Sequence, residues 1–313
     1  MKILVSGATG FVGANILRYL TSTNNAVSVL MRKTSNPWRV RDILNETDQY
    51  FCDLVKREKL RETIREIKPD VIIHLAAYGL RTPRDPMTTI QANFIGTVNI
   101  MDACAEIGFD CFINTGSCFE YGVKQQHISE TELLDPLDEY GVSKAAATLY
   151  CQSVAKRENL PVFTLRLFRP YGYYEQPKTL ISSIIISCLK KMPLKLFTPT
   201  AVRDFIFIKD VVDAYSDVIT KGSSIYPGEI LNVGTGKQHT ISKVFEIVKK
   251  LTASEIKVEI GEVVKKHVDN AEMWAADNSR IKKIIGWSPK YDIESGLKKT
   301  VNWFEKNMHL YEV

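Results

Sequence analysis

The chain has 313 residues, more than the roughly 100–200 of a usual domain, so we expect one large domain or two closely packed ones. A hydrophobic share of 45% and a charged share of 25% are ordinary for a globular protein and argue against a disordered chain. The net charge of +5 suits an anionic substrate, and the absence of any long Lys/Arg block argues against nucleic-acid binding and against a basic membrane-binding arm.

The cysteine pattern and the lengths of the apolar runs indicate the cellular compartment of the protein. The six cysteines form no C-x-x-C pair and do not occur at the Cys/His spacings typical of zinc sites, so we expect no metal site and a reducing compartment. No apolar run approaches the roughly 18 residues of a membrane span. The first apolar run is broken by glycine within seven residues, which predicts a strand and not a signal peptide. We therefore expect a cytoplasmic protein.

The first half of the chain alternates short apolar runs with longer amphipathic stretches. The expected strands are Lys2–Ser6, Val27–Met31, Val71–Leu75, Cys111–Asn114 and Val162–Leu167. The expected helices of this half are Gly13–Thr21, Lys56–Ile67, Thr88–Glu106 and Tyr140–Glu158. This order predicts an α/β fold, a doubly wound parallel sheet of the Rossmann type. Beyond Leu167 the pattern becomes mixed, with helices expected near Leu180–Leu189, Ile241–Leu251 and Ile293–Lys306.

The first strand ends in a glycine-rich turn. Gly7, Gly10 and Gly13 give the pattern G-x-x-G-x-x-G at the point where a helix opens. Glycines allow a tight turn and close approach of the backbone to a pyrophosphate, and the helix N-terminus offers unpaired N–H groups. Such a turn can be an ordinary tight loop, but its place in a βαβ unit indicates a dinucleotide site. The candidate contacts in the turn are Gly7, Gly10, Phe11, Val12 and Gly13.

The end of the second strand bears on which dinucleotide binds. A carboxylate there would bind the ribose hydroxyls of NAD, but the strand runs into Arg32 and Lys33. Both cations suit a 2′-phosphate, so we expect NADP(H) in preference to NAD(H), which stays possible; both could also be solvated surface residues. Further candidate cofactor contacts are Asp53, Leu54, Ala76, Ala77, Asn93 and Thr115.

Tyr140 and Lys144 are spaced by four residues near the start of a predicted helix. This spacing places both side chains on one helix face, one turn apart, where the ammonium favours the phenolate form of tyrosine. Ser117 follows the strand that begins at Cys111, and the carboxyl ends of parallel strands face the ligand crevice. We therefore expect the three side chains to meet, with Ser117 on the reacting oxygen and Lys144 also holding the nicotinamide ribose.

Several motifs in the same order resemble the extended short-chain dehydrogenases/reductases, in the branch of nucleotide-sugar epimerases, dehydratases and reductases. Besides the glycine turn and the Ser117, Tyr140 and Lys144 set, these motifs are His74–Ala77, Asn93–Thr97, Arg203–Ile206, Leu231–Gly236 and Gly286–Pro289. The resemblance covers essentially the whole chain. It implies a catalytic triad of Ser117, Tyr140 and Lys144 and a homodimer formed through the helices at Thr88–Glu106 and Tyr140–Glu158.

Within that superfamily, 4,6-dehydratases carry an Asp-Glu pair directly after the catalytic Ser/Thr. Here Cys118 and Phe119 follow Ser117, and neither can act as the extra acid and base. The basic Arg32–Lys33 corner favours an NADPH-dependent reductase of a nucleotide-linked 4-keto-6-deoxy sugar, with hydride transfer to the C4 ketone and Tyr140 as proton donor. The alternative is an NAD-dependent nucleotide-sugar 4-epimerase. A catalytically idle dinucleotide sensor would not need the intact triad.

The resemblance also implies which residues meet the substrate. Arg203 matches a position that contacts the substrate diphosphate, and Lys178 and Leu180 match a loop against the nucleotide. Arg169 replaces a common asparagine, so its contact could be the diphosphate or the nicotinamide side. The candidate substrate residues are Ser117, Phe119, Arg169, Lys178, Leu180 and Arg203. We expect an NADP(H)-binding Rossmann domain at 1–167, with a returning segment near 203–222, and a mixed α/β nucleotide-sugar domain at 168–313.

Overall fold

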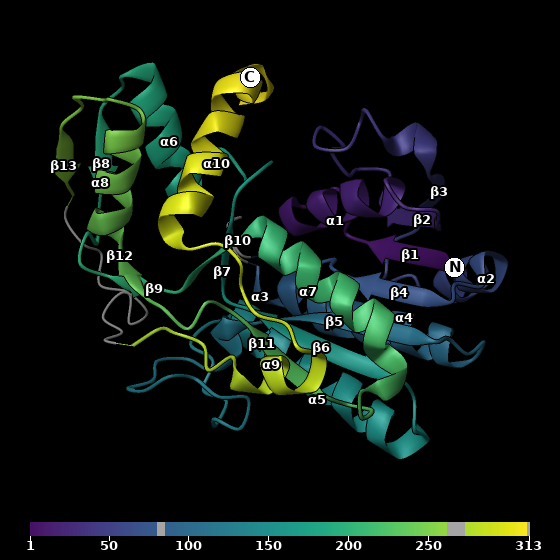
Figure 1. Ribbon diagram of the computed structural model, residues 1–313. Coiled ribbons are helices and arrows are strands. Elements are labelled where there is room, and N and C mark those ends of the chain that lie inside the picture. The colour runs from purple at the N-terminus through teal and green to yellow at the C-terminus, as the bar shows by residue number, and fades with distance from the viewer. Residues whose placement is uncertain (80–84, 262–272, 312–313) are drawn as a thin grey trace.

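A seven-stranded parallel sheet forms the centre of the computed structural model, which describes residues 1–79, 85–261 and 273–311 (Figure 1). The strand order is β11-β6-β5-β4-β1-β2-β3, and every neighbouring pair is parallel. The strands are β1 (Lys2–Ser6), β2 (Ala26–Met31), β3 (Asp48–Phe51), β4 (Val71–His74), β5 (Cys111–Ser117), β6 (Val162–Leu167) and β11 (Ile230–Val233). The doubly wound Rossmann prediction is confirmed.

Helices cover both faces of this sheet because its inner strands, unlike the edge strand β3, are apolar on both sides (Figure 1). Along β1, Ile3 and Val5 face one core, where α1 (Phe11–Thr21) contacts α7 (Ile208–Lys221). Leu4 faces the opposite core, beneath three other helices. These are α2 (Arg57–Ile67), α4 (Gly96–Ala105) and α5 (Glu139–Glu158).

The strand order reverses between β1 and β4, and the crevice at such a switch point is where doubly wound sheets bind ligands. His74, the last residue of β4, ties this point to the neighbouring helix. Its Nδ1 lies 2.7 Å from Ser6 Oγ and its Nε2 lies 2.9 Å from Thr97 Oγ1. Burial lowers the pKa of His74 to about 3, so the ring stays neutral between these two hydroxyls.

The helix expected at Thr88–Glu106 is interrupted by a π-helical turn. The structure has α3 (Pro86–Ile90), the π segment η2 (Gln91–Ile95) and then α4. The cause is Asn93, whose side-chain amide donates to the Tyr78 carbonyl at 2.9 Å and accepts from the Tyr78 N–H at 2.7 Å. A π turn of this kind is a local widening of the helix that commonly lies near functional sites.

The second half of the chain forms short paired strands and a group of helices beside the sheet (Figure 1). The pairs are β7 (Arg169–Tyr171) with β10 (Phe205–Phe207), β9 (Val202–Arg203) with β12 (His239–Thr240), and β8 (Leu194–Leu196) with β13 (Val258–Ile260). The helices are α6 (Leu180–Lys190), α8 (Ile241–Leu251), α9 (Ser279–Ile285) and α10 (Ile293–Asn307). Short turns are η1 (Leu44–Glu46), η3 (Cys118–Glu120), η4 (Gly222–Ser224) and η6 (Met308–Tyr311). Because α7 and β11 join the main sheet layer, the boundary at residue 167 stays a prediction.

The six cysteines are free and buried. Within residues 1–79, 85–261 and 273–311, no three His, Cys, Asp or Glu side chains are grouped to hold a metal ion. Nor does that part of the chain contain a helix with both the length and the apolar character to cross a bilayer.

Candidate active site

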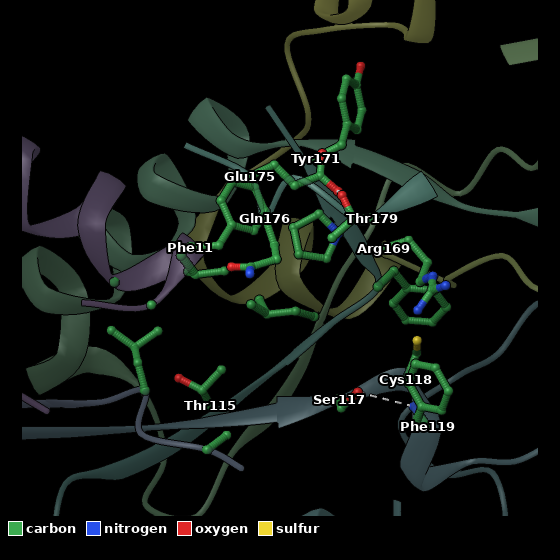
Figure 2. A pocket seen from close by; sticks show the side chains of 18 of the residues that line it. Phe11, Thr115, Ser117, Cys118, Phe119, Arg169, Tyr171, Glu175, Gln176 and Thr179 are labelled. Carbon is green, nitrogen blue, oxygen red and sulfur yellow. Dashed lines mark hydrogen bonds between the residues drawn. The ribbon is translucent and has the colours of Figure 1, made fainter. Parts of the chain in front are cut away.

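A cavity of about 550 Å³ lies at the carboxyl ends of the sheet strands, between the sheet and the second half (Figure 2). Most of the residues expected to form the site line it. These are Gly7, Gly10, Phe11, Val12, Gly13, Ala77, Thr115, Ser117, Phe119, Tyr140, Lys144, Arg169 and Leu180. The expected residues that do not line it are Arg32, Lys33, Asp53, Leu54, Ala76, Asn93, Lys178 and Arg203.

The glycine turn leaves no room for side chains. Gly7 has a φ of +75°, and a Cβ there would lie 2.5 Å from the backbone N of Ala76. A Cβ on Gly13 would lie 2.2 Å from the Gly7 carbonyl oxygen. Gly10 caps α1 without a side chain, so the first N–H groups of the helix are left for a ligand. The turn therefore fits a dinucleotide pyrophosphate, which needs close backbone approach and N–H donors.

Arg39 is a cavity residue that the sequence reasoning did not identify. Its guanidinium donates to the carbonyls of Tyr174 and Thr9, at 2.7 Å and 3.2 Å, and to Gln176 Oε1 at 2.5 Å. All three acceptors are neutral. Burial lowers the pKa of Arg39 to about 10, an effect that the nearby Tyr311 and Glu175 side chains partly offset. The protein thus holds a poorly compensated cation beside the glycine turn, suited to an anionic group. Arg39 lies in an irregular segment, where no periodic pattern reveals a side chain's direction.

The remaining predicted cofactor residues lie outside the cavity. Arg32 and Lys33 follow β2 and are exposed. Asp53 closes its own turn, with its carboxylate accepting from the N–H of Val55 at 3.2 Å. Leu54 packs against Gly96, where an added Cβ would lie 3.1 Å from the Leu54 Cβ. Their roles in cofactor binding stay predictions, as do those of Ala76 and Asn93.

Ser117, Tyr140 and Lys144 converge on the cavity, as their sequence order predicts. Asp138 caps α5 by accepting from the N–H of Gly141 at 2.8 Å, which fixes the first turn of the helix. Tyr140 and Lys144 then lie one turn apart on the buried face, at 9% and 2% exposure. Ser117 ends β5 and hydrogen-bonds Tyr140. The arrangement brings an ammonium, a phenol and a hydroxyl to one wall.

The pKa of Tyr140 differs in direction from the sequence expectation. Burial raises it, and the hydrogen bond from Ser117 only partly offsets that rise. Burial also lowers the pKa of Lys144, which the charge of Glu120 partly offsets. The expected shift toward phenolate is therefore not found, because desolvation of the buried phenol is the largest effect on its pKa. The phenol is protonated at neutral pH.

Glu120 and Arg166 form a buried network beneath Ser117 that the sequence reasoning missed. Arg166 Nε lies 2.7 Å from Glu120 Oε2, with the two side chains 2% and 0% exposed. Glu120 Oε1 accepts from the N–H of Ser117 at 2.7 Å and from Thr148 Oγ1 at 3.1 Å. Arg166 also donates to Tyr121 Oη at 2.8 Å. A charged side chain inside an apolar strand requires a buried partner of opposite charge. Arg166, between Leu165 and Leu167, is therefore the feature of the sequence that could have revealed this network.

Aromatic rings continue the wall beyond Tyr140. The ring of Phe119 lies edge-on to that of Tyr140, with centroids 5.9 Å apart, and 6.0 Å from that of Trp274. Trp274 Nε1 donates to Cys118 Sγ at 3.3 Å. Burial raises the pKa of Cys118 to about 11 despite the nearby charge of Arg169 and the Trp274 hydrogen bond. Cys118 is therefore a neutral thiol that fills the wall.

Two arginines flank these rings. The Cζ of Arg169 lies 5.3 Å from the centroid of Phe119, and that of Arg203 lies 5.4 Å from Trp274. Arg169 lines the cavity, whereas Arg203 is buried and does not line it. Figure 2 shows Arg169 beside Phe119, at the end of the cavity opposite Phe11. Lys178 is exposed next to the start of α6. The substrate contacts expected for these residues stay predictions.

Comparison with known sequences places this arrangement among related proteins. The model of the NAD dependent epimerase/dehydratase family matches residues 3–234. A UDP-glucuronate 4-epimerase of Thermodesulfobacterium geofontis is 27% identical over 320 residues, covering 98% of this chain and 97% of the relative. A dTDP-glucose 4,6-dehydratase of Salmonella typhimurium is 24% identical and covers 98% of this chain and 93% of the relative.

Solved structures share the fold over nearly the full length. A UDP-glucose 4-epimerase of Thermotoga maritima, determined with UDP-glucose, has a TM-score of 0.90 at 25% identity, covering 98% of this chain and 100% of the other. A UDP-glucuronic acid 4-epimerase of Bacillus cereus, determined with UDP-glucuronic acid and NAD, has a TM-score of 0.87 at 25% identity, with the same coverage of each chain.

Proposed function

This chain belongs to the NAD dependent epimerase/dehydratase family, and we propose that it is an NAD-dependent 4-epimerase of a nucleotide-linked sugar. The observation that carries the proposal is the cluster of Ser117, Tyr140 and Lys144 on a cavity that begins at the glycine turn. A phenol, a hydroxyl and an ammonium beside a dinucleotide site are suited to moving a proton at an alcohol or ketone oxygen. The named relatives that are 4-epimerases support the same reaction.

The glycine turn and Arg39 would hold the dinucleotide, with its pyrophosphate at the start of α1 and beside the guanidinium. Lys144 would hold the nicotinamide ribose. A nicotinamide held there would supply a hydride acceptor and donor.

Tyr140 would take the proton of the sugar 4-hydroxyl and return it once the other face of the sugar has been reduced. Ser117 would donate to the same oxygen and hold it in line with Tyr140, to which it is already hydrogen-bonded. Because burial raises the pKa of Tyr140, the phenol is a ready proton donor but a poor base. Removal of the first proton therefore requires the phenolate form of Tyr140, which a nearby cation such as the Lys144 ammonium would favour.

The dehydratase relatives share the fold, but Cys118 and Phe119 argue against 4,6-elimination here. Elimination of water requires an acid and a base in addition to the proton carrier. The Cys118 thiol, with a pKa of about 11, accepts a hydrogen bond from Trp274 and is buried, and Phe119 has no titratable group. Neither position supplies the chemistry.

A reductase of a nucleotide-linked 4-keto-6-deoxy sugar is the second candidate. One observation favours it: Arg32 and Lys33 follow β2 with no carboxylate, which suits NADP(H). Tyr140, protonated at neutral pH, would donate the proton to the ketone oxygen. The epimerases and the dehydratase named above support the epimerase alternative better than this reductase, which the sequence reasoning favoured.

The test separates the two by their need for a reductant. Purified protein is incubated with UDP-glucose or UDP-glucuronate and catalytic NAD, and the C4 epimer is sought by NMR. A parallel series contains stoichiometric NADPH and nucleotide 4-keto-6-deoxy sugars, followed by loss of the reduced-nicotinamide absorbance. Epimer formation without net cofactor consumption supports the first candidate. NADPH consumption with no epimerisation replaces it by the second.

We also propose that the protein is a homodimer. Large apolar side chains are exposed on neighbouring helical segments: Met87 on α3, Ile95 on η2, and Val142 and Leu149 on α5, at 62%, 40%, 46% and 52% exposure. The three segments α3, η2 and α5 contact one another. A second copy of the same face would cover them.

A further inference from the structure

We propose that Arg169 binds a carboxylate at C5 of the substrate sugar, so that the chain acts on a nucleotide-linked hexuronate in preference to a neutral hexose. The inference rests on the proposed reaction at C4, which places the reacting carbon at Tyr140. It gives a role to a cation that the proposed reaction does not itself use.

Arg169 is held in place by its backbone. It begins β7, which pairs in parallel with β10, and its N–H donates to the Asp204 carbonyl at 3.0 Å. The side chain is therefore directed into the cavity by a fixed strand and lies over the ring of Phe119. Across the described ranges, the guanidinium has no carboxylate partner. A half-buried cation on a cavity wall, paired with a ring alone, is suited to an anionic ligand.

The order of groups along the wall indicates which anion. Phe119 contacts Tyr140 directly, and Arg169 lies on Phe119, so this cation is one ring away from the proton carrier. Arg203 lies on Trp274, one ring further along, and does not line the cavity. In a nucleotide hexose, the C5 substituent is adjacent to C4, whereas the diphosphate is attached to C1 across the sugar ring. The nearer cation therefore meets the C5 substituent.

A neutral C5 substituent would stabilise the Arg169 guanidinium less than the water it displaces. Substrate entry removes water from the guanidinium, and a hydroxymethyl or methyl group offers at most one neutral acceptor in return. A carboxylate can accept two parallel N–H bonds and cancel the charge. The same cation therefore favours hexuronates and disfavours neutral hexoses.

The experiment measures binding by calorimetry on the full chain loaded with NAD. The ligands are the pairs UDP-glucuronate with UDP-glucose and dTDP-glucuronate with dTDP-glucose, and UDP alone. The wild-type protein should prefer the hexuronate in at least one pair. Arg169→Gln should weaken hexuronate binding roughly 10- to 100-fold and leave UDP and the neutral hexose within about threefold. Arg169→Lys should retain part of the preference. Arg157→Gln, at an exposed end of α5, is the matched control and should change nothing.

Three results would overturn the proposal: no hexuronate preference in either pair, an equal loss for UDP and for both sugars in Arg169→Gln, or the same selective loss in the control. An equal loss would place Arg169 at the diphosphate. These arms need no turnover, so a preference for hexuronates with no epimerisation would count against the proposed function and leave the Arg169 assignment standing. Thermal unfolding of each variant identifies any that fail to fold.

Discussion

Arg39 gives the sharpest test of where the cofactor phosphates lie. Burial lowers the pKa of its guanidinium from 12.5 to about 10, which corresponds to roughly 3 kcal/mol of unfavourable charging. An anionic pyrophosphate beside the guanidinium would recover up to that amount. Arg39→Gln should therefore weaken ADP and NAD by as much as about 100-fold, because neutral glutamine has no such charge to satisfy.

The assay compares adenosine, ADP and NAD by calorimetry on the same variants. Adenosine lacks phosphate, so its affinity should stay within about threefold in Arg39→Gln, while Arg39→Lys should lie between the wild type and Arg39→Gln. Gln176→Met, which removes the neutral side-chain partner of Arg39, is the control for disruption of the local structure. Equal losses for adenosine and ADP, or a Gln176→Met effect as selective as that of Arg39→Gln, would refute the reasoning.

Three further changes test other parts of the structure. Tyr140→Phe keeps the ring but removes the proton carrier, so kcat should fall by about 100-fold or more while the nucleotide-sugar Kd changes little. Burial lowers the pKa of His74 from its ordinary value of 6.5 to about 3 in the folded chain. The unfolded chain therefore binds the extra proton first, and the wild type should lose up to ~1.4 kcal/mol of unfolding free energy per pH unit as the pH falls from 6.5 toward 3. Urea unfolding across this pH range should show a smaller loss for His74→Gln. Leu149→Glu should convert the proposed dimer to monomer in light scattering, because it places charge on the exposed apolar face.

Each of these has a contrary result. Unchanged kcat in Tyr140→Phe would remove the phenol from the reaction. Parallel pH profiles for the wild type and His74→Gln would mean that the ring is not kept neutral by burial. A Leu149→Glu protein with the wild-type mass would place any interface elsewhere, and a wild type that is already monomeric would refute the dimer itself. An exposed substitution on α2, Glu62→Lys, is the control for the last experiment.

Five of the seven strands could be predicted because they are short, apolar runs; β3, with the sequence DQYF and exposed on most of its length, carries no such signal, and β11 was not predicted either. Ile3, Leu4 and Val5 form such a run, and the glycine turn that follows is set by local sterics. The resemblance to extended short-chain dehydrogenases/reductases, read from motifs in a fixed order, is confirmed. The meeting of Ser117 with Tyr140 also follows from topology, since parallel strands deliver their carboxyl ends to one edge.

Features decided by contacts between distant residues could not be read in this way. The π turn depends on Asn93 meeting the backbone of Tyr78, which precedes it by fifteen residues. Arg39 lies in an irregular loop and meets segments more than a hundred residues later in the chain. The direction of the Tyr140 pKa depends on burial, which the spacing of Tyr140 and Lys144 does not report.

The buried pair of Glu120 and Arg166 restricts which substitutions this sequence can tolerate. Loss of either partner leaves an unpaired buried charge, which typically costs about 3–5 kcal/mol. A Cβ on Gly116 would lie 2.7 Å from Glu120 Oε1 and 2.8 Å from Arg166 Cγ, so that position is restricted too. Single substitutions at any of the three are therefore poor evolutionary steps. In descendants of this sequence, we expect Gly116, Glu120 and Arg166 to be inherited together or replaced together.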